Sequence, residues 1–143
     1  MEMAAEKRIS GQCLCGAVTV RAAVDAPVLR ACHCDMCRRH TSGMFISLET
    51  LPGSVEVEGP ARSFRSSEWA ERGFCETCGS TLWYGTVEDG ARHLAAGLFD
   101  DAGGGAMSIE FFADRCPRGY ALAGDQKKLT TEQTIELFSG SRE

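Results

Sequence analysis

The sequence predicts a mostly β fold, a β-sheet structure of short antiparallel strands with little helix. Three observations support this prediction. Short segments alternate apolar and polar residues, turn residues separate these segments at regular intervals, and the apolar periodicity of helices is nearly absent. Short strands that follow one another with glycines between them are typical of an all-β sandwich or a barrel-like sheet.

The strand candidates can be placed in order along the chain. Alternation is clearest in residues 17–21 and 54–58. Further short strand candidates are residues 45–48, 62–65, 81–84, 93–96 and 109–112. The turn signals between them are Pro27, Pro52–Gly53, Gly59–Pro60, Glu88–Gly90 and Gly103–Gly105.

Helical signal is confined to two short segments. Residues 35–40 can form one turn, and residues 130–137 can form a short helix capped by Thr130 or Thr131. The chain has 143 residues and shows no internal repeat or linker. We therefore expect a single domain over residues 1–143, ordered over about residues 10–138, with flexible ends.

Composition and charge exclude several functional classes. Hydrophobic residues make up 43% of the chain, enough for an ordinary core. The net charge is −5 and no basic stripe is visible, which argues against nucleic-acid binding. No segment approaches the ~20 apolar residues of a membrane span, and no apolar signal sequence is visible. We expect a cytoplasmic protein with no membrane partner, in which clustered cysteines are metal ligands or reactive thiols rather than disulfides.

Seven of the eight cysteines fall into three compact groups. The groups are Cys13 and Cys15; Cys32, Cys34 and Cys37; and Cys75 and Cys78, while Cys116 stands alone. The C-x-x-C-G sequence from Cys75 to Gly79 is the clearest, because its two thiols can share a metal from one tight turn and the glycine permits a positive φ. It predicts a zinc knuckle on a hairpin, which needs two more ligands to complete a tetrahedron.

Either of the other two cysteine groups could supply the remaining ligands of the knuckle. If Cys13 and Cys15 lie on a strand, their side chains share one face and can meet the same ion as Cys75 and Cys78. A four-thiolate site of this kind would close a long loop, so we expect the fold to depend on its metal. The spacing alone leaves the pairing open. The alternative is that the C-x-x-C and C-x-C sequences occur by chance and do not share a metal.

The remaining trio, Cys32, Cys34 and Cys37, would then form a second site running from a strand end into a turn. Three protein ligands with one open position are the arrangement of catalytic zinc sites. A thiol bound at the open position would be deprotonated and could attack an electrophilic carbon.

Other interpretations of the trio stay open at this level. His33, His40, His93 or Cys116 could supply a fourth ligand and make a second structural site, or the trio could act as oxidisable thiols. If residues 32–34 are extended, His33 points to the opposite face from its two neighbours. Cys116, in front of a proline, is predicted to be a free thiol.

The motifs around these cysteines resemble the glutathione-dependent formaldehyde-activating enzyme family, also described as centromere-protein-V-like. The resemblance rests on Cys13-Leu-Cys-Gly-Ala-Val18, Cys32-His-Cys-Asp-Met-Cys-Arg-Arg39 and Gly73-Phe-Cys-Glu-Thr-Cys-Gly-Ser80, which occur in the family's order within residues 10–120. It implies an Mss4-like, zinc-stabilised β fold. It also implies a structural zinc on Cys13, Cys15, Cys75 and Cys78 and a second zinc on Cys32, Cys34 and Cys37.

The resemblance further implies a carbon–sulfur lyase that joins glutathione and formaldehyde into S-hydroxymethylglutathione. We therefore expect two zinc ions per chain, and a small-molecule thiol and an aldehyde as partners. Arg38 and Arg39, or Arg65, could bind a substrate carboxylate, because the acidic chain as a whole does not attract an anion. The alternatives are a zinc-stabilised binding module without turnover, since the fold does not fix the function, and a zinc or thiol buffer.

Overall fold

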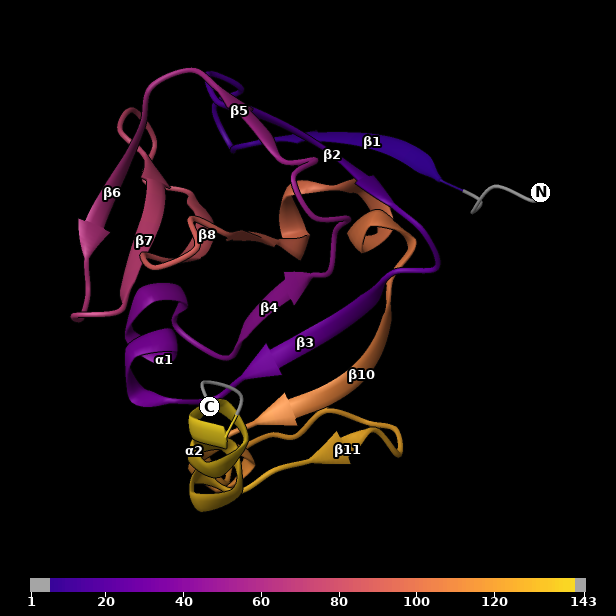
Figure 1. Cartoon of the computed structure of the whole chain (residues 1–143), viewed down its shortest axis with the longest axis vertical. Coiled ribbons are helices and arrows are strands. Elements are labelled where there is room, and N and C mark those ends of the chain that lie inside the picture. Colours follow the sequence, from indigo (N-terminus) through magenta and orange to yellow (C-terminus); the bar gives the residue numbers. More distant parts are fainter. Residues whose placement is uncertain (1–5, 141–143) are drawn as a thin grey trace. The chain divides into compact units, whose positions relative to one another are not determined.

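The computed structural model of the chain describes residues 6–140 (Figure 1). Within them the protein is mostly β, with two α-helices and three short 3-10 helices. The strands are β1 (Lys7–Gln12), β2 (Thr19–Val24), β3 (Val28–Cys32), β4 (Phe45–Leu48), β5 (Glu56–Glu58), β6 (Ala61–Arg65), β7 (Ala70–Cys75), β8 (Thr81–Thr86), β9 (Arg92–Ala95), β10 (Ala106–Phe111) and β11 (Lys127–Lys128). The helices are α1 (Asp35–Thr41), η1 (Ala96–Leu98), η2 (Asp100–Gly104), η3 (Ala113–Arg115) and α2 (Thr131–Gly140).

The chain divides into two compact units that are discontinuous in sequence. The first unit comprises residues 6–28 and 47–106, and the second comprises residues 29–46 and 107–140. Each unit contains one complete group of close cysteines, as described below. The expectation of a single domain stays a prediction.

The first unit is built from antiparallel strands (Figure 1). Strand β2 lies between β1 and β5. Strands β6, β7, β8 and β9 form an antiparallel meander, and β9 pairs with the last two residues of β4. Fully buried aliphatic side chains fill its core, among them Val18, Val20, Leu82 and Leu94. The meander brings the end of β7 and the start of β8 together at a tight turn, which carries Cys75 and Cys78.

A glycine and a tryptophan fix the packing of β7 on β8. Gly73 lies opposite Trp83, which is only 5% exposed. A Cβ atom on Gly73 would lie 2.2 Å from the indole ring, so only glycine leaves room for the tryptophan. The guanidinium of Arg92 covers the indole of Trp83 at 4.4 Å from its centroid.

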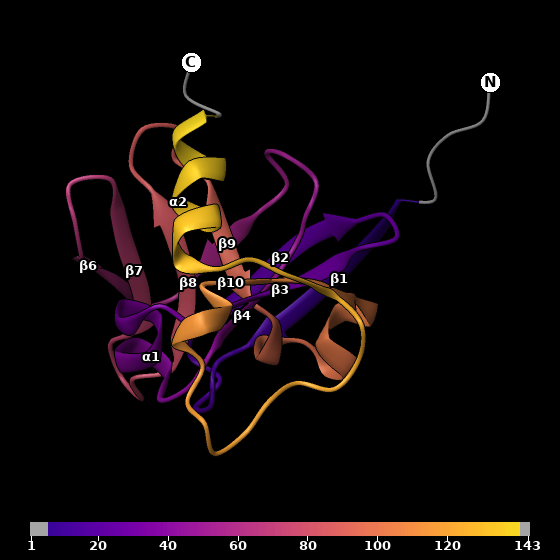
Figure 2. The same ribbon diagram turned by 90° about the horizontal axis from the view of Figure 1, so that it is seen from below.

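The second unit contains β3, β10, β11 and both α-helices (Figures 1 and 2). The backbone N–H of His33, just past β3, donates to the carbonyl of Phe111 on β10 at 3.0 Å. Helix α2 packs at the end of β10, where the rings of Phe111 and Phe138 are 5.3 Å apart. Buried Thr134 of α2 accepts a hydrogen bond from the backbone N–H of Phe112 at 3.1 Å.

The predicted fold class, mostly β with little helix, is confirmed, and most strands were anticipated within a few residues. Residues 45–48 form β4 as predicted, and α1 and α2 lie where the two helical segments were placed. Residues 17 and 18 were predicted to start a strand but belong to the turn before β2. Strands β1 and β11 were not predicted, and β3 and β7 were anticipated only as a strand end and a hairpin at their cysteines. Strand β11 pairs with β10 in parallel rather than antiparallel fashion.

The described ends of the chain are more regular than expected. Strand β1 starts at Lys7 and α2 extends to Gly140, both outside the predicted ordered range of residues 10–138. The prediction of flexible ends also concerns residues 1–5 and 141–143, which lie outside the described residues. Within residues 6–140, no helix combines the length and the apolar character needed to cross a membrane.

Candidate metal centres

The first unit gathers four cysteines, Cys13, Cys15, Cys75 and Cys78, which we call the four-thiol cluster. All four sulfur atoms lie within 4.8 Å of one another. Cys75 is fully buried and Cys13 is 3% exposed, whereas Cys15 is exposed and Cys78 half-buried. The structure therefore brings the C-x-x-C group and the C-x-C group together, a pairing that the spacing left open and the family resemblance implied.

The C-x-x-C half of the cluster is a tight turn between β7 and β8. The backbone N–H of Cys75 donates to the carbonyl of Ser80 at 3.0 Å, and Gly79 donates back to the carbonyl of Cys75 at 2.8 Å. Gly79 has a φ of 81°, a conformation that favours glycine. The predicted knuckle on a hairpin is thus the observed local structure.

The C-x-C half differs from the prediction. Cys13 and Cys15 do not share the face of a strand, because they lie in the turn between β1 and β2. Cys13 closes this turn by donating its N–H to the carbonyl of Val18 at 3.0 Å, and Gly16 turns the chain with a φ of 83°. The two sulfur atoms still meet, 3.6 Å apart, because the turn folds both side chains to one side.

Hydrogen-bond donors surround the four sulfur atoms. Backbone N–H groups reach Cys13 from Val18 at 3.3 Å, Cys15 from Ala17 at 3.5 Å and Cys75 from Cys78 at 3.5 Å. Such bonds from backbone to sulfur support thiolate ligands and orient them. The donor set therefore suits deprotonated cysteines.

Ser80 supplies the donors at the fourth sulfur. Its hydroxyl oxygen accepts from the N–H of Leu14 at 3.0 Å, which leaves the hydroxyl hydrogen for Cys78 at 3.1 Å. These contacts, first from the Ser80 hydroxyl and then from its backbone N–H, lower the pKa of Cys78 to about 5. Cys78 can therefore be a thiolate at neutral pH.

The protonation of this cluster explains why it suits a cation. The N–H of Ala17 lowers the pKa of Cys15, but burial and the neighbouring thiols raise it more, to about 11. Four thiolates cannot be held this close without a compensating positive charge. Four sulfurs at about 2.3 Å from a tetrahedral zinc would be about 3.8 Å apart. The sulfur–sulfur separations of 3.6 Å between Cys13 and Cys15 and 3.9 Å between Cys15 and Cys75 fit that geometry.

The second unit gathers Cys32, Cys34 and Cys37, which we call the three-thiol cluster. Their sulfur atoms also lie within 4.8 Å of one another. Cys32 ends β3, Cys34 caps α1, and Cys37 is buried in the first turn of α1. The sulfur of Cys34 accepts from the N–H of Cys37 at 3.4 Å, so the helix start holds these two thiols together.

This cluster likewise disfavours separate ionisation of its thiols. The neighbouring thiols Cys34 and Cys37, and then burial, raise the pKa of Cys32 far above its ordinary value. A divalent cation would remove this penalty, because a coordinating thiol is deprotonated. The residues present fit a metal ion with three sulfur ligands.

No fourth ligand from the described residues joins this group. His33, His40, His93 and Cys116 are all absent from the set of mutually close ligand atoms. Cys116 instead points its sulfur at the carbonyl of Tyr120, 3.4 Å away.

His33 belongs to a buried polar network that the sequence did not reveal. Its Nε2 donates to Oε1 of Glu110 at 2.8 Å, and Oε2 of Glu110 accepts from Gln126 at 2.6 Å. His33 and Glu110 are 2% and 3% exposed. Burial would raise the pKa of Glu110, but the bonds from Gln126 and His33 outweigh it and lower the pKa. The network thus fixes the residue between two thiols of the three-thiol cluster.

The arginines proposed to bind a substrate differ in their surroundings. Arg38 donates to Asp35 at 3.0 Å, while Arg39 is exposed on α1. Arg65 donates to two backbone carbonyls near the β6–β7 turn. Arg115, which the sequence analysis did not single out, donates to both oxygens of Asp35 at 2.8 and 2.9 Å. Arg115 and Asp35 are 80 positions apart in the chain, so no local pattern could indicate this contact.

Comparison with known proteins agrees with the motifs. A model of the family described as glutathione-dependent formaldehyde-activating enzyme matches residues 8–115. A protein of Schizosaccharomyces pombe that is named an uncharacterized lyase is 32% identical over 132 residues, which cover 88% of this chain and 93% of that relative. The matched range contains all seven clustered cysteines and ends one residue before Cys116. The chain therefore belongs to the glutathione-dependent formaldehyde-activating enzyme family.

Proposed function

We propose that the protein is a lyase-type enzyme that forms or breaks a carbon–sulfur bond between a small thiol, such as glutathione, and a small aldehyde, such as formaldehyde. The observation that carries the proposal is the three-thiol cluster, whose sulfur atoms lie within 4.8 Å of one another with no fourth ligand from residues 6–140 in the group. Family membership and a relative named a lyase support the reaction class.

The two clusters have different proposed roles. Cys13, Cys15, Cys75 and Cys78 would hold a structural zinc with four sulfur ligands and no open position. Cys32, Cys34 and Cys37 would hold a second zinc with one position open. Zinc in such a site lowers the pKa of a thiol that enters the open position, which supplies a thiolate at neutral pH.

The protein's own residues would bind and orient the reactants. The start of α1 fixes Cys34 and Cys37, and the buried pair His33–Glu110 fixes the chain between Cys32 and Cys34. In the addition, the sulfur forms a bond to the aldehyde carbon, the carbon–oxygen double bond becomes single, and the oxygen gains the proton that the thiol lost. The reverse reaction releases both partners.

The proposed setting follows from the same chemistry. A reducing compartment such as the cytoplasm keeps all eight thiols available for metal binding. The partners would then be a small thiol and an aldehyde, without nucleic acid or membrane. Arg38 and Arg39, beside the last thiol of the cluster, stay candidates for binding a substrate carboxylate.

The first experiment counts zinc. Zinc per chain is measured under reducing conditions with and without glutathione, and X-ray absorption gives the mean number of sulfur ligands per zinc. Two zincs per chain, with sulfur coordination that rises when glutathione is added, are the expected result. One zinc per chain that glutathione does not change would contradict the proposed active site and leave only the structural site.

A second candidate function is a zinc-stabilised binding module without turnover. The observation that favours it is the exposure of three large apolar side chains on α2, Ile135, Leu137 and Phe138, at 54%, 48% and 48%. A binding module would need such side chains to join into a contiguous apolar patch that covers a partner. Nuclear magnetic resonance exchange measurements of formaldehyde and glutathione with their adduct separate the two candidates, because only an enzyme accelerates the exchange in proportion to its concentration.

A further inference from the structure

Two arginines meet at one carboxylate at the start of α1. Oδ1 of Asp35 accepts from Nη2 of Arg115 at 2.8 Å and from Nη2 of Arg38 at 3.0 Å, and Oδ2 accepts from Nη2 of Arg115 at 2.9 Å. We call these three residues the arginine cluster. With two guanidinium groups and one carboxylate, the three side chains together carry a net charge of +1.

The cluster retains donors that can bind a second carboxylate. Its contacts with the described residues use only Nη2 of each guanidinium, whereas an arginine has five N–H donors in a planar fork. The side chains of Arg38, Asp35 and Arg115 are 36%, 38% and 51% exposed. A ligand can therefore reach the cluster, and the fork geometry of arginine suits a carboxylate.

The position of Arg115 is built into the fold. Phe112, at the end of β10, adopts a left-handed conformation with a φ of 55°, which is uncommon for a bulky residue. The chain then forms η3, which is closed by a hydrogen bond from the N–H of Arg115 to the carbonyl of Phe112 at 2.9 Å. The N–H of Ala113 donates to the carbonyl of Leu129 at 2.7 Å, which ties this turn to the segment before α2.

A neighbouring carboxylate secures the other side of the same turn. Asp114 accepts from the N–H of Thr131 at 2.6 Å and from its hydroxyl at 3.0 Å, so its oxygen is engaged at the start of α2. These bonds hold η3 on both sides. Arg115 is therefore delivered to Asp35 by a constrained turn rather than by a long flexible loop.

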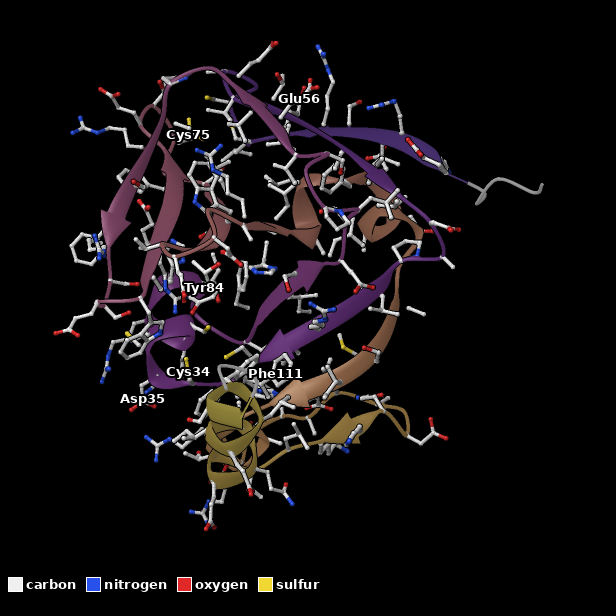
Figure 3. All side chains as sticks on the ribbon, viewed as in Figure 1. Cys34, Asp35, Glu56, Cys75, Tyr84 and Phe111 are labelled. Carbon is white, nitrogen blue, oxygen red and sulfur yellow. The ribbon has the colours of Figure 1, made fainter. Side chains whose placement is uncertain are left out.

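Asp35 and Arg38 of the arginine cluster lie on α1, the helix that begins at the three-thiol cluster. Asp35 directly follows Cys34 at the start of α1 (Figure 3), and Arg38 directly follows Cys37 in the sequence. One residue of a peptide spans about 3.5 Å, so a cysteine-containing peptide carries a carboxylate within one or two residues of its sulfur. A single ligand of that size would place its sulfur at the thiols and its carboxylate at the arginines if it bound both clusters.

We propose that Arg38 and Arg115, held together by Asp35, form a carboxylate subsite that makes the three-thiol cluster selective for thiols bearing a carboxylate. This inference rests on the proposed function, because it concerns the substrate of the same site. It replaces Arg39 by Arg115 as the second cationic partner, since Arg115 is the arginine that shares a carboxylate with Arg38.

The test compares a charged thiol with its neutral counterpart. Zinc-loaded full-length protein is titrated by calorimetry with glutathione and with glutathione diethyl ester, in which both carboxylates are blocked. The variants are Arg115→Ala, Arg115→Lys and, as a matched control, Arg21→Ala. Arg21 is similarly exposed, at 58%, and its ion pairs with described residues are long, at 3.9 and 4.0 Å. Zinc content and melting temperature are measured for each variant.

The wild type is expected to bind glutathione more tightly than its diethyl ester. Arg115→Ala should weaken binding of glutathione about tenfold or more, the effect of a lost charge-assisted hydrogen bond, and should change binding of the ester less than twofold. Arg115→Lys should restore part of the affinity, and Arg21→Ala should behave as wild type.

Three results would overturn the inference. Equal losses for glutathione and the ester would mean that Arg115 acts only on the structure, and an unchanged affinity for glutathione would mean that it does not contact the ligand. If the wild type binds both thiols equally, only the carboxylate subsite fails. If it binds neither thiol, the proposed function itself fails, and the two failures are thus distinguishable.

Discussion

The sulfur atoms of Cys15 and Cys75 lie 3.9 Å apart, although 60 residues separate the two cysteines in the chain. This contact joins the turn between β1 and β2 to the turn between β7 and β8. A metal held by both turns closes a long loop. In the chain-entropy model of a cross-link, a loop of this length stabilises the fold by about 4 kcal/mol.

Removing one ligand from each cluster should therefore have unequal effects. Cys78→Ser should lower the melting temperature by ~10 °C or more, because a structural zinc site contributes several kcal/mol of folding free energy. Cys34→Ser should leave the fold largely intact and abolish thiol binding. Thermal unfolding and calorimetric titration with glutathione measure the two effects. Equal loss of stability in both variants would contradict the assignment of one cluster to a structural site and the other to a reactive site.

The packing of Trp83 on Gly73 gives a second prediction. Gly73→Ala places a methyl group 2.2 Å from the indole ring, so β7 or the ring must shift. Overpacking of this kind costs about 1–3 kcal/mol. Gly119→Ala is a matched control, because nothing lies within 4 Å of its added Cβ. Urea unfolding monitored by tryptophan fluorescence measures both; similar stability of the two variants would contradict the prediction.

The local motifs of the candidate centres could be predicted from the sequence, because a C-x-x-C-G turn needs only neighbouring residues. Cys75 and Gly79 occupy the predicted turn, and Cys34 with Cys37 occupy the predicted strand-to-turn segment. The prediction that Cys13 and Cys15 lie on a strand was wrong. A strand and a turn can both bring residues i and i+2 together, so the spacing did not distinguish them.

The long-range contacts could not be predicted. Glu110 is 77 residues from His33, and nothing in the spacing of either residue indicates a partner. Strand β1 was missed because its sequence KRISGQ is mostly polar and its side chains are largely exposed, so hydrophobic alternation is weak. Its pairing with β2 depends on tertiary structure rather than on its own composition.

The buried carboxylate of Glu110 gives a prediction about pH. Its lowered pKa means that the ionised form stabilises the folded state above the ordinary glutamate pKa of about 4.3. This stabilisation is lost as the pH falls through the lowered pKa of the folded protein. Glu110→Gln should therefore be less stable than wild type at pH 7, by about 1–3 kcal/mol, and the difference should shrink below about pH 4.

Melting temperatures of wild type and Glu110→Gln between pH 7 and pH 3 test this. Loss of metal at low pH affects both proteins, so the difference between them isolates the contribution of Glu110. Glu88→Gln, in an exposed turn, is the control and should follow wild type throughout. A difference between wild type and Glu110→Gln that stays constant with pH would show that the charge of Glu110 is not the cause.

The last prediction concerns Cys116, the cysteine outside both clusters. Burial, and then the negative charge of Glu110, raise the pKa of its thiol, and its sulfur points to the carbonyl of Tyr120. Cys116→Ser should therefore leave zinc content, sulfur coordination and glutathione affinity unchanged. Elemental analysis, X-ray absorption and calorimetry measure these quantities. If the variant loses one zinc, or if its sulfur coordination falls by one at the second site, then Cys116 is the fourth ligand. The site would then be closed, and a thiol could enter only by displacing Cys116.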